Sequence, residues 1–294
     1  MEKVKNCIVC NSDVSKSIGY VRSEAGVVEV KSCCNCAHNY TSFRSKSDSG
    51  TASANATLTT ESYAKGMIQK SNEYNSGMNL LAKNRLNYFK SVLDSDNIKI
   101  LEIGCGAGSL GYGFIKAGLT VQGYLGIELD KELSSHARSR GLQVVNDDFL
   151  EYDFGDERFD VICFSQVLEH INDPYTFIQK AYSILSCNRD SMLYIEIPNH
   201  FSLAGLFSIL LRGYKYRLGS IQWPYHCSSY SKQSLIYLIK SVMPSSQIVV
   251  KTKKPSDKTF GQGGKYGLFE KIYFLLSSLL CSKSLIVATV KVRA

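Results

Sequence analysis

Glycines recur at nearly alternate positions in the stretch ILEIGCGAGSLG, which runs from Ile100 to Gly111. The apolar residues before the glycines predict a buried strand that ends at Ile103, and the pattern from Ser109 onward suits the start of a helix. The glycines therefore occupy a turn between a strand and a helix. A turn with so few side chains lets a ligand approach the main chain closely, so this stretch indicates a binding site.

Strands and helices alternate through the rest of the chain. This alternation predicts an α/β fold, a mostly parallel, doubly wound sheet with helices on both faces. Such sheets bind ligands at the carboxyl ends of their strands. The expected strands after the glycine turn cover 121–129, 142–146, 159–164, 192–197, 248–251 and 285–292. The expected helices cover 76–95, 109–117, 131–139, 174–186, 232–242 and 268–280.

Residues 199–230 break this alternation, because an apolar stretch, basic residues and aromatics are mixed there. We expect an insertion that caps the ligand edge of the sheet. Arg212, Lys215 and Arg217 within it suit a phosphate on a ligand, although a solvated face of the cap explains them equally well. The apolar face of the helix expected at 268–280 is interrupted by charge, which favours core packing over lipid binding.

Cysteines form two C-x-x-C pairs near the N-terminus. Their spacing allows a small ribbon to bring four thiolates around one tetrahedral Zn²⁺, with His38 as a substitute ligand and Cys34 as the spare thiol. A glycine turn between β-prone residues predicts the hairpin that carries the second pair. Four thiolates leave no open coordination position, so we expect a structural metal. The predicted ligands are Cys7, Cys10, Cys33 and Cys36.

Composition divides the chain into three parts. We expect a zinc ribbon at 1–44, a Ser-, Thr- and Ala-rich linker and lead-in at 45–75, and one large domain at 76–294. No apolar leader follows Met1 and no run approaches the roughly 20 apolar residues of a membrane span. We therefore expect a cytoplasmic protein whose cysteines bind metal rather than form disulfides. The net charge of +8 does not choose between an anionic small molecule, a nucleic acid and a membrane surface.

A dinucleotide cofactor would require the spacing G-x-G-x-x-G at the turn. Counted from Gly104, the third position falls on Ser109. Counted from Gly106, it falls on Gly111, which lies a turn into the helix. The pattern is therefore weak evidence for NAD.

The stretch LEIGCGAG resembles the first motif of class I S-adenosylmethionine-dependent methyltransferases, E/D-x-G-x-G-x-G, and matches it in full at Glu102, Gly104, Gly106 and Gly108. The agreement continues through GIELD, NDDFLEY and FDVICFSQVLEHINDP, over residues 98–174. The resemblance implies a Rossmann-like, seven-stranded sheet, S-adenosylmethionine as cofactor and methyltransferase activity. Glu102 is then expected to position the glycine loop or the amino group of the cofactor.

The resemblance also assigns cofactor-binding roles further along the chain. Glu128 would accept hydrogen bonds from both ribose hydroxyls through its two carboxylate oxygens. Asp148 would accept from the adenine amino group, with Phe149 as an apolar wall. Asp147 is the alternative to Asp148, because the register of this loop is open by one residue. Ser165, at the end of the fourth strand, completes the predicted site.

The ribbon, a strand that ends in PN and a later P-x-H are together similar to methyltransferases of deoxysugar nucleotides or surface-glycan precursors. These residues are Pro198, Asn199, Pro224 and His226. The branch that methylates sugar carbon usually has Glu before this histidine, whereas this chain has Tyr225. We therefore expect O-methylation of a sugar, a nucleotide sugar or a glycan precursor.

A hydroxyl acceptor is helped by a general base, and a neutral imidazole suits this task near pH 7. The predicted bases are His226 and His170, for which a structural role is equally open. An RNA methyltransferase is the alternative enzyme, although the chain has no dense Arg/Lys block and no N-P-P-Y-type motif. A non-catalytic zinc-ribbon adaptor and an NAD-dependent enzyme rank lower. The sequence does not determine the oligomeric state.

Overall fold

The structure is a computed structural model that describes a large part of the chain. The described residues are 2–23, 26–44, 61–73, 76–199, 218, 220–223, 226–253 and 285–293. Several predictions lie outside them: Arg212, Lys215 and Arg217, Pro224 and Tyr225, most of the expected insertion, and the helix expected at 268–280.

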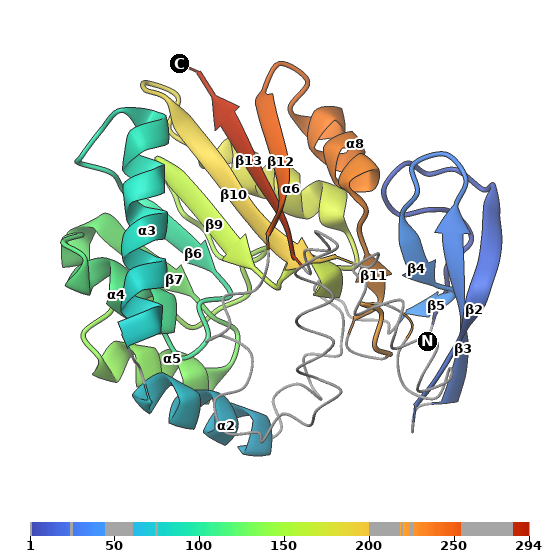
Figure 1. Ribbon diagram of the computed structural model, residues 1–294, viewed down its shortest axis with the longest axis horizontal. Helices are drawn as coiled ribbons and strands as arrows, with labels where there is room; N and C mark the ends of the chain where they lie inside the picture. Colours follow the sequence, from blue (N-terminus) through green and yellow to red (C-terminus); the bar gives the residue numbers. More distant parts are fainter. Residues whose placement is uncertain are drawn as a thin grey trace, which may run out of the picture.

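A seven-stranded sheet forms the centre of the fold, in the order β12-β13-β10-β9-β6-β7-β8 (Figure 1). The strands from β10 to β8 are parallel, and β13 pairs antiparallel with both β10 and β12. Their bounds are β6 Ile100–Ile103, β7 Tyr124–Ile127, β8 Val144–Val145, β9 Val161–Ser165, β10 Ser191–Pro198, β12 Gln247–Lys253 and β13 Leu285–Val292. The predicted α/β fold with a mostly parallel sheet is confirmed.

Helices cover both faces of this sheet, because the buried parallel strands are apolar on both sides. Ile100 packs in one core with Phe89 and Phe114, whereas Leu101, the next residue, packs in the opposite core with Phe177. The first face carries α3 Ser76–Leu93, α4 Ser109–Lys116 and α5 Lys131–Ser139. The second carries α6 Pro174–Ser183 and α8 Lys232–Val242.

The cysteine pairs lie in and next to the loops of a separate small sheet of four strands, in the order β11-β4-β3-β2, beside α8 in Figure 1. Its strands are β2 Ser15–Ser23, β3 Gly26–Cys33, β4 Asn39–Thr41 and β11 Ser228–Ser229, and β1 Glu2–Lys3 pairs with β5 Phe43–Arg44 next to it. The hairpin predicted between the cysteine pairs is formed by β2 and β3.

The end of the expected cap insertion has a place that the sequence did not indicate. Its strand β11 completes the sheet of the ribbon by pairing with β4, and Trp223 packs in a core with Val21 and Val30. The ribbon is therefore built from two distant parts of the chain, and the insertion predicted only as a cap contributes to it.

Two further expectations need correction. The lead-in predicted as part of a linker contains α2, Glu61–Asn72. The strand expected at 121–129 is shorter, because Thr120 Oγ1 accepts a hydrogen bond from Gly123 N and caps the 3₁₀ turn η1, Val121–Gly123, before β7 begins. A second 3₁₀ turn, η2, covers Leu168–His170 after β9.

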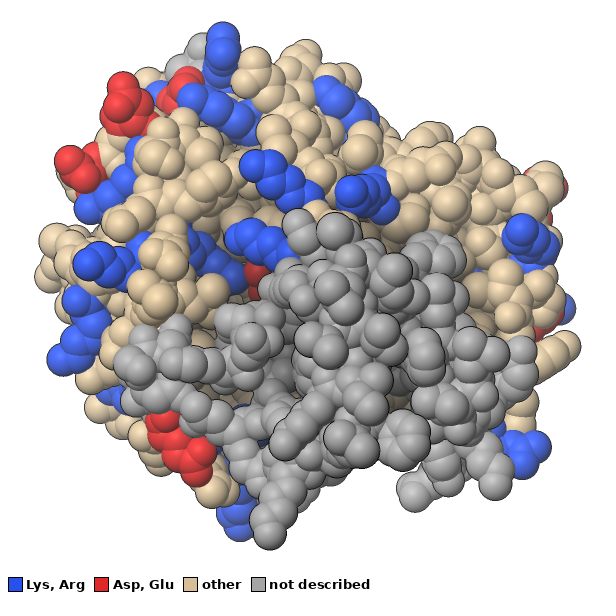
Figure 2. All heavy atoms as spheres, in the orientation of Figure 1, with Lys and Arg blue, Asp and Glu red and all other residues tan. Residues whose placement is uncertain are grey.

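Charge on the surface is dispersed. On the face shown in Figure 2, the described Lys and Arg side chains are scattered over several elements and are not gathered into one stripe. Of the helices within the described residues, none is both long and apolar enough to cross a membrane.

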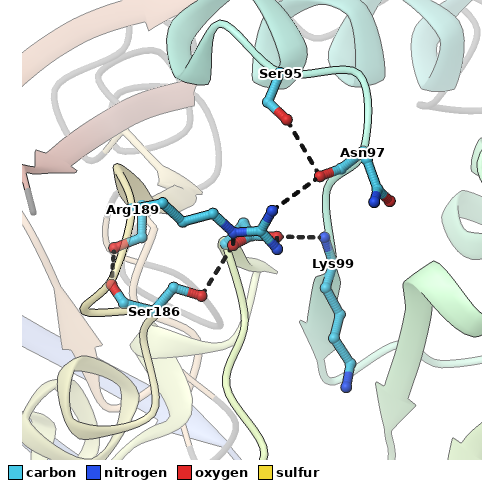
Figure 3. A network of polar contacts seen from close by, with 7 residues as sticks. Ser95, Asn97, Lys99, Ser186 and Arg189 are labelled. Carbon is cyan, nitrogen blue, oxygen red and sulfur yellow. Dashed lines mark hydrogen bonds and ion pairs between the residues drawn. The ribbon is translucent and has the colours of Figure 1, made fainter.

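Asp160 ties together the amino ends of three neighbouring strands, and Figure 3 labels its partners Lys99, Ser186 and Arg189. Its buried carboxylate accepts hydrogen bonds from Lys99 N at 2.7 Å, Ser186 Oγ at 2.9 Å and Arg189 Nη2 at 2.6 Å. Lys99 directly precedes β6, Asp160 precedes β9, and Arg189 lies just before β10. This network fixes the strands at the edge opposite the glycine turn.

Candidate cofactor and acceptor site

A cavity of about 430 Å³ opens where β6, β7 and β9 end. The chain runs from β6 outward to β7 and β8 and then returns to β9 on the other side of β6, so the cavity lies where the strand order reverses. Ligands of α/β folds bind at such a point, and the volume suits a small-molecule cofactor. The lining residues include Tyr63, Met67, Gly104, Gly106, Glu128, Asp147, Asp148, Phe149, Ser165, Gln166 and His170.

The glycine turn meets this cavity at Gly106. Its φ is +54°, and a Cβ added there would meet no atom within 4 Å, so the adjoining space is open to a ligand. Gly108, at φ +74°, has a different reason for being glycine. A Cβ there would lie 2.8 Å from Ala137 Cβ and 2.6 Å from Leu142 Cδ1. Gly108 therefore permits close packing of α4 and does not line the cavity.

Glu128 follows β7 directly and links the glycine turn to the next helix. Its Oε2 accepts a hydrogen bond from Gly106 N at 2.8 Å, and its Oε1 accepts one from Asp130 N at 2.9 Å. Burial raises the pKa of the Glu128 carboxyl, while these two backbone bonds favour its ionised form. Each oxygen keeps lone-pair capacity for a ligand hydroxyl, as the predicted ribose contact requires.

The loop after β8 brings both predicted acidic residues to the cavity. Asp148 is buried and its Oδ1 accepts from Leu150 N at 2.8 Å, whereas Asp147 is exposed and accepts from Asp148 N. Phe149 packs against Phe177, with ring centroids 4.9 Å apart, and presents an apolar wall. The burial of Asp148 favours it over Asp147 as a directional partner for a base.

Glu102 lies in β6 beneath the glycine turn and does not line the cavity. Tyr124 donates a 2.7 Å hydrogen bond to its Oε2. Burial raises the pKa of Glu102 to about 7, despite this bond. The position favours the first of its two predicted roles, support of the glycine loop.

Ser165 lines the cavity at the end of β9, as predicted, and accepts a 3.2 Å hydrogen bond from Arg85, which also pairs with Glu196 at 2.8 Å. Gln166 was missed. It has φ +59°, and its amide Nε2 is buried without a hydrogen-bond partner among the described residues. Strained backbone and unpaired donors are found at binding sites, so this donor suits a ligand atom.

Helix α2 was also missed as part of the site, because its composition resembles a linker. Tyr63 and Met67 line the cavity, and Ser71 donates a 3.2 Å hydrogen bond to the Ala107 carbonyl of the glycine turn. The four-residue spacing of Tyr63, Met67 and Ser71 is the signal that indicates one helical face.

The two predicted catalytic histidines lie together. Their rings pack edge to face with centroids 4.6 Å apart, although His170 lies in η2 and His226 precedes β11. The Nδ1 of His226 is 2.9 Å from the Ser220 carbonyl oxygen. Glu169, next to His170, is 2% exposed, and burial raises its pKa to about 8. The sequence reasoning overlooked Glu169.

The predicted zinc ligands cluster in the ribbon, apart from the cavity. All four sulfurs lie within 4.8 Å of one another. Cys7 Sγ is 3.6 Å from Cys36 Sγ, and Cys10 Sγ is 3.4 Å from Cys33 Sγ. The hydrogen bond with Cys7, together with burial, raises the pKa of the Cys36 thiol. All four cysteines would therefore be thiolates only with a bound cation to balance their charge. The arrangement fits tetrahedral Zn²⁺, and the described cysteines are all free thiols.

A family model described as "Methyltransferase domain" matches residues 74–241, from α3 through α8. The chain belongs to this methyltransferase family. The open space at Gly106, the two carboxylate oxygens of Glu128 and the Gln166 Nε2, which has no partner in the described part of the chain, fit S-adenosylmethionine. The predicted class I S-adenosylmethionine-dependent methyltransferase is confirmed at the level of family and fold.

Curated relatives of this methyltransferase share part of its length. A ubiquinone biosynthesis O-methyltransferase of Actinobacillus pleuropneumoniae serotype 5b (strain L20) is 32% identical over 123 residues, which is 38% of this chain and 50% of that protein. The corresponding protein of Pelagibacter ubique (strain HTCC1062) is 29% identical over 119 residues, 39% of this chain and 48% of the relative. The chain spans about half the length of the curated relatives it matches.

Solved structures resemble this methyltransferase in fold. The plantazolicin methyltransferase BpumL, in complex with SAH, has a TM-score of 0.55 at 16% identity, and the match covers 82% of this chain and 94% of that one. A SAM dependent methyltransferase from Archaeoglobus fulgidus has a TM-score of 0.50 at 17% identity, over 73% and 94% of the two chains. At these identities the likeness supports the fold alone.

Proposed function

We propose that this chain transfers a methyl group from S-adenosylmethionine to a hydroxyl oxygen of a small polar acceptor. The observation that carries the proposal is the cavity itself, in which a cofactor cradle at Gly106 and Glu128 is continuous with a polar wall at His170. When bound, S-adenosylmethionine supplies the methyl group as an activated sulfonium. The chain's own residues then orient the cofactor and the acceptor.

The role that we propose for each residue follows from the strand end at which it lies. Glu128 holds the ribose and Asp148 the adenine amino group, with Phe149 alongside. Ser165 ends β9 and Gln166 follows it, and both line the cavity, as His170 does. The imidazoles of His170 and His226 are the groups that act on the acceptor hydroxyl, because methyl transfer to its oxygen requires loss of its proton.

A sugar, a nucleotide sugar or a glycan precursor is the acceptor class that we propose first, with O-methylation favoured over C-methylation. A phenolic hydroxyl is the second class, because the curated relatives are named as O-methyltransferases of ubiquinone biosynthesis. RNA ranks below both, since Lys and Arg are dispersed over the described face in Figure 2. The reduced thiols of the ribbon suit a cytoplasmic setting, and the zinc is proposed as structural.

The test is incubation of the purified chain with methyl-labelled S-adenosylmethionine and a panel of nucleotide sugars, sugar phosphates, phenolic acids and RNA. We expect label in one of the small-molecule classes and none in RNA. Label found only in RNA would contradict the proposal and identify an RNA methyltransferase. A chain that binds no S-adenosylhomocysteine in calorimetry would be an adaptor that retains the fold.

A further inference from the structure

Glu169, His170 and His226 form a second cluster of metal-ligating groups, distinct from the cysteine quartet. A carboxylate oxygen and one nitrogen from each ring all lie within 4.8 Å of one another. The three residues come from two segments, the turn η2 after β9 and the residues before β11. The cluster reaches the cofactor cavity through His170, which lines it.

The buried carboxylate of Glu169 is not explained by the fold or by the contacts given above. The residue is 2% exposed, and neither of its oxygens has a hydrogen-bond partner among the described residues. An unpartnered buried carboxylate is costly, and natural structures neutralise such groups with a partner or a metal.

His226 is already held in the form that a metal requires. A carbonyl oxygen only accepts hydrogen bonds, so the 2.9 Å contact with the Ser220 carbonyl places the proton on Nδ1. The lone pair is then on Nε2. A histidine ligand typically donates its other ring N–H to a backbone carbonyl in this way.

We propose that Glu169, His170 and His226 bind one divalent transition-metal cation at the acceptor end of the cavity, and that the acceptor hydroxyl completes its coordination. Two imidazoles and one carboxylate leave positions open for substrate oxygen, unlike the closed cysteine quartet. The role of this cation in methyl transfer rests on the proposed function, whereas the binding of the cation does not.

The cation would act on the acceptor rather than on the cofactor. A hydroxyl bound to a divalent cation loses its proton more readily, and that proton passes to solvent water. The hydroxyl oxygen forms a bond to the methyl carbon, and the carbon–sulfur bond breaks with its electron pair remaining on sulfur. The histidines would then serve as ligands in place of free bases.

Manganese binding measured by electron paramagnetic resonance tests the site, using the full chain with zinc already in its ribbon. Mn²⁺ prefers nitrogen and oxygen ligands, so it reports on this cluster and not on the thiolates. We expect one Mn²⁺ per chain, and affinity at least tenfold weaker in Glu169→Gln and His226→Ala. His136→Ala, a histidine of α5 outside the cluster, should bind as the parent does.

The result that overturns the proposal is a parent chain that binds no Mn²⁺, or variants that bind it unchanged. If Glu169→Gln fails to fold, the visible spectrum of the parent with Co²⁺ decides, because a site of nitrogen and oxygen ligands lacks the thiolate charge-transfer bands. Mn²⁺ binding without methyl transfer to any acceptor would leave the site standing and remove the proposed function. Full transfer after removal of the Mn²⁺, with zinc retained, would remove the catalytic role of the cation.

Discussion

Ser228 pairs with Tyr40 across the edge of the ribbon sheet, although 188 positions separate them in the chain. This pairing joins the strand that follows His226 to the strand that follows the last cysteine of the quartet. Tyr230, just beyond, contacts both sides, with its ring 4.8 Å from that of His38 and its hydroxyl 3.5 Å from the Leu168 carbonyl of η2. The ribbon therefore supports the part of the chain where His170 and His226 lie together.

Loss of the ribbon metal should impair turnover more than cofactor binding. In Cys10→Ser we expect zinc content to fall and turnover to drop at least tenfold, because β4 and β11 no longer hold His226 against His170. Affinity for S-adenosylhomocysteine should change less than threefold, since Glu128 and Asp148 lie on other elements. Zinc released to a colorimetric chelator and labelled methyl transfer provide the measurements. Cys34→Ser, an exposed cysteine of the same ribbon outside the quartet, is the matched control, and equal losses in both variants would contradict this role.

Removal of the Glu128 carboxylate, which we propose binds the ribose, should weaken cofactor binding. In Glu128→Gln we expect at least tenfold weaker binding of S-adenosylhomocysteine, because hydrogen bonds to a charged group contribute about 1.5–3 kcal/mol. Isothermal titration calorimetry measures the change. Glu132→Gln, on the first turn of α5, should bind like the parent, and unchanged binding in Glu128→Gln would reject the assignment.

Two alanine substitutions should separate the two uses of glycine in the turn. Gly106→Ala places a methyl group in open cavity, so it should lose cofactor affinity, with about 1–2 kcal/mol of backbone strain. Gly108→Ala forces a methyl group against Ala137 and Leu142, so it should lose more stability than Gly106→Ala does. Urea unfolding and calorimetry on both variants check this contrast, and the reverse ranking would refute it.

His226 should matter for turnover and not for the cofactor. In His226→Ala we expect turnover at least tenfold lower with unchanged binding of S-adenosylhomocysteine, because the residue faces His170 rather than the residues that hold the cofactor. Single-turnover kinetics with labelled cofactor make the measurement. Unchanged turnover would remove His226 from the mechanism.

Ionisation of Glu102 should lower the free energy of unfolding as pH rises. Its pKa is raised from 4.5 to about 7, so the folded chain binds this proton more tightly than the unfolded chain does. The stabilisation is complete below pH 4.5 and is lost as pH rises to about 7, with a span of about 3 kcal/mol. Glu102→Gln cannot ionise, so its unfolding free energy relative to the parent should increase over this interval. Urea titrations at pH 5 and pH 8 test it, and parallel pH profiles would contradict the prediction.

The sequence by itself determined the sheet, the glycine turn and several of the side chains that line the cavity, Glu128, Asp148 and Ser165 among them. These depend on local signals: apolar runs of strand length, glycines at a strand end, and acidic residues at the tips of β7 and β8. The cysteine spacing likewise predicted that the four cysteines cluster in a small ribbon, because the two cysteines of each C-x-x-C pair already lie close together in the chain.

Only the tertiary structure decided which residues far apart in the sequence lie next to each other. No local pattern indicates that Ser228 pairs with Tyr40, that Glu169 is buried beside two histidines, or that α2 closes the cavity through Tyr63. These contacts form because strand β4 needs a partner along its free edge and because apolar side chains must be covered. The segment that meets these requirements is the one that the complete fold brings close in space. The spacing of residues along the sequence does not indicate which segment that is.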